Sequence, residues 1–157
     1  ERPGLNKESD MHETNTHMLQ RYAQCWDSHD VEGLVALLTE DIVYEDAALG
    51  WTHHGIAEFR EFAAKVFAMH PDFSLRYLDA FATETRGAAE WIIETSFEGE
   101  FEGVQISGGQ VSFRGATLFE LRDGRICRNR DLWNYADWMR QLGVTRLADA
   151  ARAASAG

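Results

Sequence analysis

The sequence lacks the features that mark secreted and membrane proteins. Its 157 residues include only two cysteines, Cys25 and Cys127, which are too few for a disulfide framework. Both fall in segments predicted below to be a helix and a strand, so we expect two free thiols in a reducing compartment. No stretch approaches roughly 18 uninterrupted apolar residues, and the N-terminal segment contains no apolar core of a signal peptide. These absences favour a cytoplasmic protein.

Basic charge is also scarce. The chain has 15 Lys and Arg residues against 26 Asp and Glu residues, which gives a formal net charge of −11. Because nucleic-acid-binding surfaces neutralise phosphates with Lys and Arg, we expect no DNA or RNA partner and no binding to anionic membranes. The glycine-rich residues 99–109 lack both the GxGxxG spacing and a following Lys-Ser or Lys-Thr pair. We therefore expect no organic cofactor.

The remaining composition, 45% hydrophobic and 26% charged, is that of an ordinary soluble domain. A chain of this length fits one domain, which buries roughly 70% of the surface that the unfolded chain exposes. The ends differ from the middle, because the first residues are polar without a period and the last are rich in alanine. We predict a polar tail at residues 1–17, a folded domain at residues 18–143, and an Ala-rich extension at residues 144–157.

Three helices are predicted in the first half of the chain. Apolar residues at positions i, i+3, i+4 and i+7 mark the first, which carries Tyr22 and Trp26 on one face and ends near residues 28–30. A second, short helix has its apolar side at residues 34–38. The third shows helical spacing over residues 56–67 and is stopped by Pro71.

Strands dominate the second half. One short strand, Ile42 to Asp46, precedes the third helix, and from Phe73 onward the apolar pattern has a period of two. Turn signals at residues 86–87 and 123–124 separate further strands at residues 73–83, 88–97, 110–121 and 125–133. Helices followed by antiparallel strands indicate an α+β fold, with three helices packed on one face of a curved, mostly antiparallel sheet.

The last predicted strand carries the clearest candidate for a functional group. Asn129, Asp131 and Trp133 alternate with Arg128 and Arg130, so the two sets face opposite sides of the sheet. Burying an unpaired arginine costs roughly several kcal/mol, so we expect Arg128 and Arg130 to face solvent. Asp131 and Asn129 then face the helices. Burial of Ile42 in the same way places Tyr44 and Asp46 on the inner face of their strand.

Two enclosed carboxylates in one pocket take different pKa values, which allows one to act as a base and the other as an acid. Tyr22 would donate a hydrogen bond to an oxygen on which negative charge develops. Walls of mostly apolar residues would bind an apolar small molecule, and the expected wall residues are Trp26, Trp91, Ile93, Phe97, Phe113, Asn129 and Trp133. Alternatives remain for single residues: Asp131 could cap a helix or pair with Arg130 or Arg140, and Tyr22 could be a core residue.

Adjacent histidines, His53 and His54, suggest a metal site with Asp46. Neighbouring side chains in an extended segment point to opposite sides, so the two imidazoles can hardly bind one ion, and we expect no metal. His54, before Gly55 at the start of the third helix, is the better candidate for a proton carrier that faces the pocket, since histidine titrates near neutral pH.

Residues 20–50, QRYAQCWDSHDVEGLVALLTEDIVYEDAALG, resemble the opening of bacterial ketosteroid isomerases. The resemblance puts Tyr22 at the place of the oxyanion-hole tyrosine and Asp46 at the place of the general base. The isomerases carry a second aspartate on a later strand, and the matching residues 114–119 contain no acid. This difference argues against strict steroid isomerisation.

Residues 99–126, together with Gln141-Leu142-Gly143, are similar to SnoaL-like polyketide cyclases. Both resemblances imply the cone-shaped fold of the NTF2-like superfamily and a cofactor-independent isomerase, cyclase or dehydratase. Asp46 would be the base, Tyr22 would stabilise the enolate, and Asp131 would be an acid or proton relay for a small polyketide- or steroid-like carbonyl compound.

Residues 130–133 more weakly resemble limonene epoxide hydrolase, in which an aspartate helps to activate water. That resemblance implies epoxide hydrolysis by Asp46, Tyr44 and Asp131 as an alternative, although the Arg-x-Asp pair of that enzyme has no counterpart at residues 91–93. A further alternative is a non-catalytic binding or association domain, in which tryptophans fill the cavity.

We also expect a homodimer through the outer face of the sheet. That face would alternate apolar residues with charged ones of both signs, which suits a self-complementary two-fold patch. The expected apolar residues are Ile92, Leu118, Ile126 and Leu132.

Overall fold

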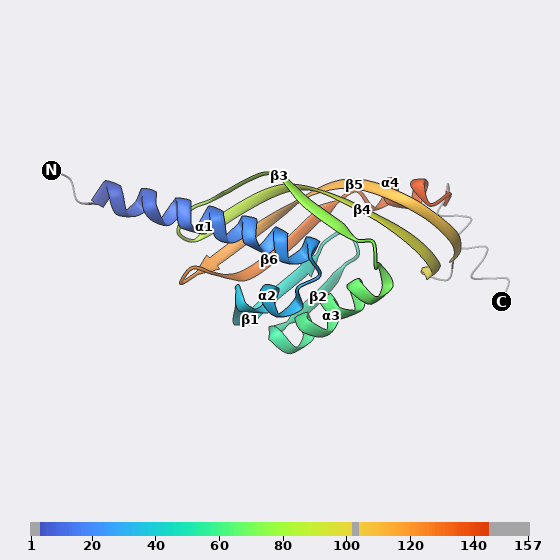
Figure 1. Cartoon of the computed structure of the whole chain (residues 1–157), viewed down its shortest axis with the longest axis horizontal. Helices are drawn as coiled ribbons and strands as arrows, with labels where there is room; N and C mark the ends of the chain where they lie inside the picture. Colours follow the sequence, from blue (N-terminus) through green and yellow to red (C-terminus); the bar gives the residue numbers. More distant parts are fainter. Residues whose placement is uncertain (1–3, 102–103, 145–157) are drawn as a thin grey trace.

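The structure is a computed structural model, and it describes residues 4–101 and 104–144. Its four helices and six strands within those residues follow one another along the chain as shown in Figure 1. They are α1 (Gly4–Asp27), α2 (Val31–Ala36), β1 (Leu38–Asp46), β2 (Trp51–His54), α3 (Gly55–Met69), β3 (Ser74–Ala82), β4 (Arg86–Phe101), β5 (Val104–Arg122), β6 (Arg125–Trp133) and α4 (Tyr135–Gln141).

The strands form a single sheet in the order β2-β1-β6-β5-β4-β3. All neighbouring strands are antiparallel except β1 and β6, which are parallel. Figure 1 shows the long strands curving over the helices α1, α2 and α3, which lie together on the concave side. The predicted α+β architecture, three N-terminal helices on a curved and mostly antiparallel sheet, is confirmed.

The core lies between these helices and the sheet. Leu19, Leu34, Phe59 and Ile126 are fully buried there, and the large aromatic residues of α1 and α3 pack edge to face around Trp26. Edge-to-face packing places the positive ring edge against a negative ring face, so these contacts add to the burial of apolar area. The result is a stiff aromatic layer beneath the inner face of the sheet.

Helix α1 is longer than its apolar pattern predicts. Residues 4–17, which we assigned to a polar tail, belong to the helix from Gly4 onward. The buried Asn15 side chain donates to the Thr83 carbonyl at 2.8 Å, and the Thr16 hydroxyl accepts from the Ala82 amide at 3.1 Å. Because polar contacts anchor this part of the helix to the end of β3, a search for apolar periodicity does not find it. Of the predicted Ala-rich extension at residues 144–157, residues 145–157 lie outside the described residues.

Residues 99–101 and 104–109 of the glycine-rich stretch belong to strands β4 and β5, whereas the sequence predicted strands that end at residue 97 and begin again at residue 110. Strands β4 and β5 continue pairing through Phe97–Gly109 and Gly99–Ile106, with an irregularity between the two pairs. Gly99 and Gly108 have φ angles of 130° and 97°, which residues with a side chain rarely adopt. The glycines therefore allow both strands to bend and lengthen.

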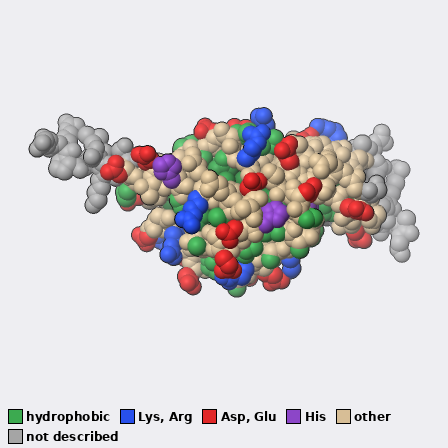
Figure 2. All heavy atoms as spheres, viewed as in Figure 1, with side chains coloured by type: hydrophobic (Ala, Val, Ile, Leu, Met, Phe, Trp, Pro, Cys, Tyr) green, Lys and Arg blue, Asp and Glu red, His purple; other side chains and the backbone are tan. Residues whose placement is uncertain are grey.

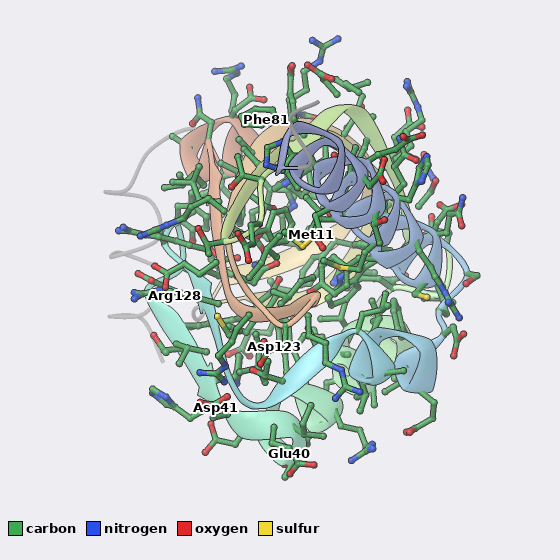
Figure 3. All side chains as sticks on the ribbon, turned by 90° about the vertical axis from the view of Figure 1, so that its left-hand side faces the viewer. Met11, Glu40, Asp41, Phe81, Asp123 and Arg128 are labelled. Atoms are coloured by element: carbon green, nitrogen blue, oxygen red, sulfur yellow. The ribbon has the colours of Figure 1, made fainter. Side chains whose placement is uncertain are left out.

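A β-bulge in β6 corrects one predicted orientation. Leu121 pairs with Ile126 and Glu120 with Arg128, so Cys127 is an extra residue in β6. The bulge turns Ile126 to the inner face, where it is completely buried, although strict alternation placed it on the outer face. Asn129 and Asp131 lie after the bulge and face inward as predicted. Figure 3 shows Arg128 at the outside of the molecule.

Two short elements were not predicted. Strand β2 pairs with β1 at the edge of the sheet, and α4 follows β6. Both have too few residues for a clear period.

Within the described residues, no helix is long and apolar enough to cross a membrane. Acidic and basic side chains are interspersed on the face that Figure 2 shows.

Candidate active site

A cavity of about 810 Å³ lies between the inner face of the sheet and the helices α1 and α3. All of the predicted site residues line it except His54. Its wall combines a few polar groups with many aromatic side chains, which is typical of sites for small organic molecules. The cavity is open although Trp26, Trp91 and Trp133 border it, so these tryptophans form walls and do not fill the space.

Asp131 is at the centre of a hydrogen-bond network on the cavity wall. Its Oδ1 accepts from the Thr117 hydroxyl at 2.6 Å and from the Asn129 amide at 2.9 Å, and its Oδ2 accepts from the Tyr44 hydroxyl at 2.5 Å. Sheet register explains the convergence, because Asp131 pairs with Thr117 on β5 and with Asp46 on β1. Asn129 pairs with Tyr44 in the next row. Three donors from three strands therefore meet at one carboxylate.

A second layer positions Thr117. The Trp91 indole nitrogen donates to the Thr117 hydroxyl at 2.8 Å, so that hydroxyl must donate onward to Asp131. The indole lies over Gly115, where an added Cβ would come within 2.3 Å of the Trp91 ring. Gly115 is thus required for the indole to reach Thr117, and this layer fixes the direction of the hydrogen bonds to Asp131.

The pKa of Asp131 is raised to about 6, mainly by burial and to a smaller extent by the neighbouring Asp46, although the hydrogen bonds from Thr117, Tyr44 and Asn129 oppose the shift. Burial also holds the pKa of Tyr44 well above its usual value, with Asp131 as the next cause. Tyr44 therefore stays a neutral phenol near neutral pH. Asp131 can change its protonation near neutral pH, as a group that moves a proton must.

The alternative structural roles of Asp131 are taken by other residues. Arg130 lies 3.4 Å from a carboxylate oxygen of Glu45, and Arg140 pairs with Asp137. Asn134 caps helix α4 by accepting from the amide of Asp137 at 3.0 Å. The Asp131 side chain makes no ion pair with either arginine and is not the cap.

Asp46 ends β1 beside Asp131, and its two oxygens differ. Oδ1 accepts from the backbone amides of Ala48 and Leu49 at 3.0 and 2.9 Å, and the Trp133 indole nitrogen lies 3.1 Å from it. Among the described residues, Oδ2 accepts only from Trp133, at 3.0 Å. Burial raises the pKa of Asp46, and the hydrogen bonds partly offset that shift. Oδ2 is therefore the oxygen with spare acceptor capacity.

Tyr22 reaches the cavity from α1. It is 2% exposed, and its hydroxyl is buried without a hydrogen-bond partner among the described residues. Trp26 and Phe119 hold its ring edge to face at 6.2 and 6.0 Å. Burial, followed by the charge of Asp131, raises the pKa of Tyr22, so the phenol stays neutral. A buried donor without a partner costs free energy unless a ligand accepts from it.

His54 is exposed and does not line the cavity, contrary to our prediction, and His53 lines it instead. The register explains the exchange, since His53 pairs with the inward Tyr44 and His54 with Val43. The His53 ring stacks on Phe62 at 4.4 Å, and burial lowers its pKa. The residues described here contain no group of three or more His, Cys, Asp or Glu side chains that could hold a metal ion.

Several residues that line the cavity were missed by the sequence analysis. Thr117 faces inward on β5, but its position opposite Asp131 depends on a strand register that the sequence does not reveal. The sequence showed the apolar period of α3, but it did not show which part of that helix borders the cavity. The other missed residues include His53, Phe62, His70, Tyr77, Thr95 and Trp138.

The curved sheet, the helices on its concave side and the cavity between them define an NTF2-like fold of the ketosteroid isomerase type. The model of the SnoaL-like polyketide cyclase family matches residues 16–142, and the chain belongs to that family. No curated protein matches it.

Solved structures of other proteins share this fold. A protein of Xanthomonas campestris described as a candidate polyketide cyclase is 24% identical, with a TM-score of 0.76 over 84% of this chain and 98% of that one. AclR of Streptomyces galilaeus, described as a candidate hydroxylase, is 22% identical, with a TM-score of 0.69 over 84% and 97%. A Catenulispora acidiphila protein with a ketosteroid isomerase-like fold, in complex with trimethylamine, is 20% identical, with a TM-score of 0.70 over 81% and 92%.

Proposed function

We propose that this protein is a cofactor-independent enzyme that moves a proton beside a carbonyl group of a small apolar compound, as an isomerase, cyclase or dehydratase does. One observation carries the proposal: Asp46 and Asp131 stand side by side on parallel strands, both with raised pKa values, on the wall of an aromatic cavity. Perturbed carboxylates in a cavity are typical of acid–base catalysts. Membership of the cyclase family agrees with this function.

Asp46 is the proposed general base. Its Oδ2 accepts a single hydrogen bond, so one lone pair remains to take a proton from carbon. The Trp133 indole and the two backbone amides fix the carboxylate at the end of β1. A base held in this way needs little reorganisation when the substrate binds.

Tyr22 is the proposed donor to the enolate oxygen. Its hydroxyl lies on the cavity wall with no hydrogen-bond partner in the part of the chain that the structure describes, and its raised pKa keeps the proton on the phenol. Such a donor acts mainly where negative charge develops, which lowers the barrier more than it strengthens ground-state binding.

Asp131 is the proposed acid or relay. A carboxyl group with a pKa of about 6 is protonated in roughly one molecule in ten at pH 7, which is enough to return a proton to the substrate. Tyr44 connects this group to the cavity wall through a hydroxyl that can turn when the proton moves, while the Trp91 indole keeps the Thr117 hydroxyl donating to Asp131. Substrate binding would rest on the aromatic walls.

Deuterium exchange tests this function. 1-Tetralone, an aromatic ketone, exchanges its α-hydrogens slowly in deuterated buffer at neutral pD, and proton NMR follows the loss of their signal. We expect the wild-type protein to accelerate this exchange and Asp46→Asn to abolish the acceleration. An unchanged exchange rate with wild-type protein, or full acceleration by Asp46→Asn, would contradict the proposal.

A further inference from the structure

A second polar cluster borders the same cavity, away from the two carboxylates. His70 lies directly after α3, and its Nδ1 is 3.1 Å from the Ser96 carbonyl oxygen and 3.4 Å from the Thr95 hydroxyl on β4. The Thr95 hydroxyl also contacts Asp72 Oδ1 at 3.0 Å. His70 and Thr95 both line the cavity. None of these groups takes part in the proton transfer proposed above.

The contacts determine the tautomer of His70. A carbonyl oxygen only accepts hydrogen bonds, so Nδ1 must carry a hydrogen, and in the neutral ring Nε2 then has a free lone pair. Among the described residues Nε2 makes no hydrogen bond. The His70 ring packs against Phe97 with a centroid distance of 5.6 Å. His70 is therefore a cavity-lining residue whose ring is held in place and retains one free acceptor.

Asp72 holds the cluster in place. Its carboxylate accepts from the Ser96 amide with both oxygens at 3.0 Å and from Gln110 at 3.3 Å. Hydrogen bonds from the backbone amide and side chain of Ser96 lower the pKa of Asp72, so it stays ionised. This anchor ties the start of β3 to β4 and β5, so the contact between Ser96 and His70 is held by three segments.

The two polar regions lie at different levels of the sheet. Thr117 pairs with Ala89, and Thr95 lies six residues further along β4, which corresponds to roughly 20 Å of strand. Curvature of the sheet makes the direct separation shorter. The wall between them is apolar and includes Trp91, Ile93 and Phe113. A substrate that reaches both regions must be elongated and apolar in the middle.

We propose that His70 is a second recognition point in this cavity, where Nε2 accepts a hydrogen bond from a phenol or alcohol at the end of the substrate remote from the reacting carbonyl. This inference rests on the proposed function, because it assumes that the carbonyl binds near Asp46 and Tyr22. A built acceptor favours a hydroxyl over an ether at the same place, since the ether leaves Nε2 unpaired. The substrate class is therefore narrowed to elongated carbonyl compounds that carry a hydroxyl group at the end remote from the carbonyl.

Two probes differ only in this group: 2-hydroxyanthraquinone and 2-methoxyanthraquinone. Their binding is measured by quenching of tryptophan fluorescence. We expect wild-type protein to prefer the hydroxyl compound by about fivefold to tenfold, the size typical of one buried hydrogen bond. His70→Asn can still donate to the Ser96 carbonyl but lacks the Nε2 acceptor, so we expect its preference to fall to about one. His70→Gln places an oxygen near Nε2 and should restore part of the preference.

The matched control is His54→Asn, an exposed histidine outside the cavity, which should keep the full preference. Equal binding of both probes by wild-type protein, binding of neither, or an unchanged preference in His70→Asn would overturn the inference. Nitrogen-15 NMR of the histidine rings gives a second test, because free protein must show a hydrogen on Nδ1 of His70; a hydrogen on Nε2 would also overturn it. Failure of tetralone exchange with an intact probe preference would contradict the catalytic role alone.

Discussion

Asp131→Asn should change the pH dependence of stability, and the size of that change follows from the burial of this carboxylate. Its pKa is raised from 3.8 to about 6. The folded state therefore binds this proton more tightly than the unfolded state, and stability falls as pH rises through the interval between the two values. A difference of about two pKa units corresponds to roughly 3 kcal/mol. Above about pH 6 the full cost is present.

Asparagine in this place carries no charge and loses that cost at high pH. Its Oδ1 can accept from Thr117 and Asn129, and its amide can donate to Tyr44 if the Tyr44 hydroxyl turns around. We therefore expect the free energy of unfolding of Asp131→Asn, relative to wild type, to increase by roughly 2 to 3 kcal/mol from about pH 4 to about pH 7.5.

Urea unfolding of both proteins across this pH range measures the difference. Effects of other titrating groups cancel when the two proteins are compared at each pH. A difference that stays constant with pH, or that moves in favour of wild type as pH rises, would refute the assignment of Asp131 as a carboxyl group with a pKa raised by burial.

The remaining predictions concern Tyr22, Gly115 and the outer face of the sheet. Tyr22→Phe removes a hydroxyl without a partner, so we expect turnover to fall about a hundredfold while urea unfolding shows no loss of stability. Gly115→Ala should displace the Trp91 indole from Thr117 and lower both turnover and the unfolding midpoint, whereas an unchanged midpoint would contradict the close packing. We also propose a homodimer through the outer sheet face, where Leu118 is 49% exposed. Light scattering of the wild-type protein should give twice the chain mass of 17.8 kDa, and Leu118→Glu should reduce the measured mass to that of one chain. A monomeric wild-type protein would contradict the dimer.

Much of the fold was predictable because its helices and strands bury one side each. The period of two in β6 placed Asn129 and Asp131 on the inner face, and the structure agrees. The same pattern gave the wrong face for Ile126, because the bulge at Cys127 shifts the alternation of side chains by one residue. The spacing of apolar residues in the sequence does not reveal this bulge. The N-terminal part of α1 was missed because its anchor, Asn15, is polar.

The site was predictable where a strand face decided it and not where register or helix rotation did. Asp46 and Tyr44 follow from the burial of Ile42 on the same face of β1. The position of Thr117 opposite Asp131 depends on the register between β5 and β6, which the sequence does not reveal. His53 and His54 were exchanged because the sequence did not reveal that β2 pairs with β1, which sets the direction of each ring.

The central claim, that the carboxylates of β1 and β6 move a proton, is tested most directly by one series of exchange rates. Deuterium exchange of 1-tetralone is measured at equal concentrations of wild type, Asp131→Asn and Asp46→Asn, each first shown to be folded. We predict the fastest exchange for wild type, a reduced rate for Asp131→Asn because water partly replaces a relay, and the buffer rate for Asp46→Asn, whose stability should remain within about 1 kcal/mol of wild type. Equal rates for all three proteins would contradict the account.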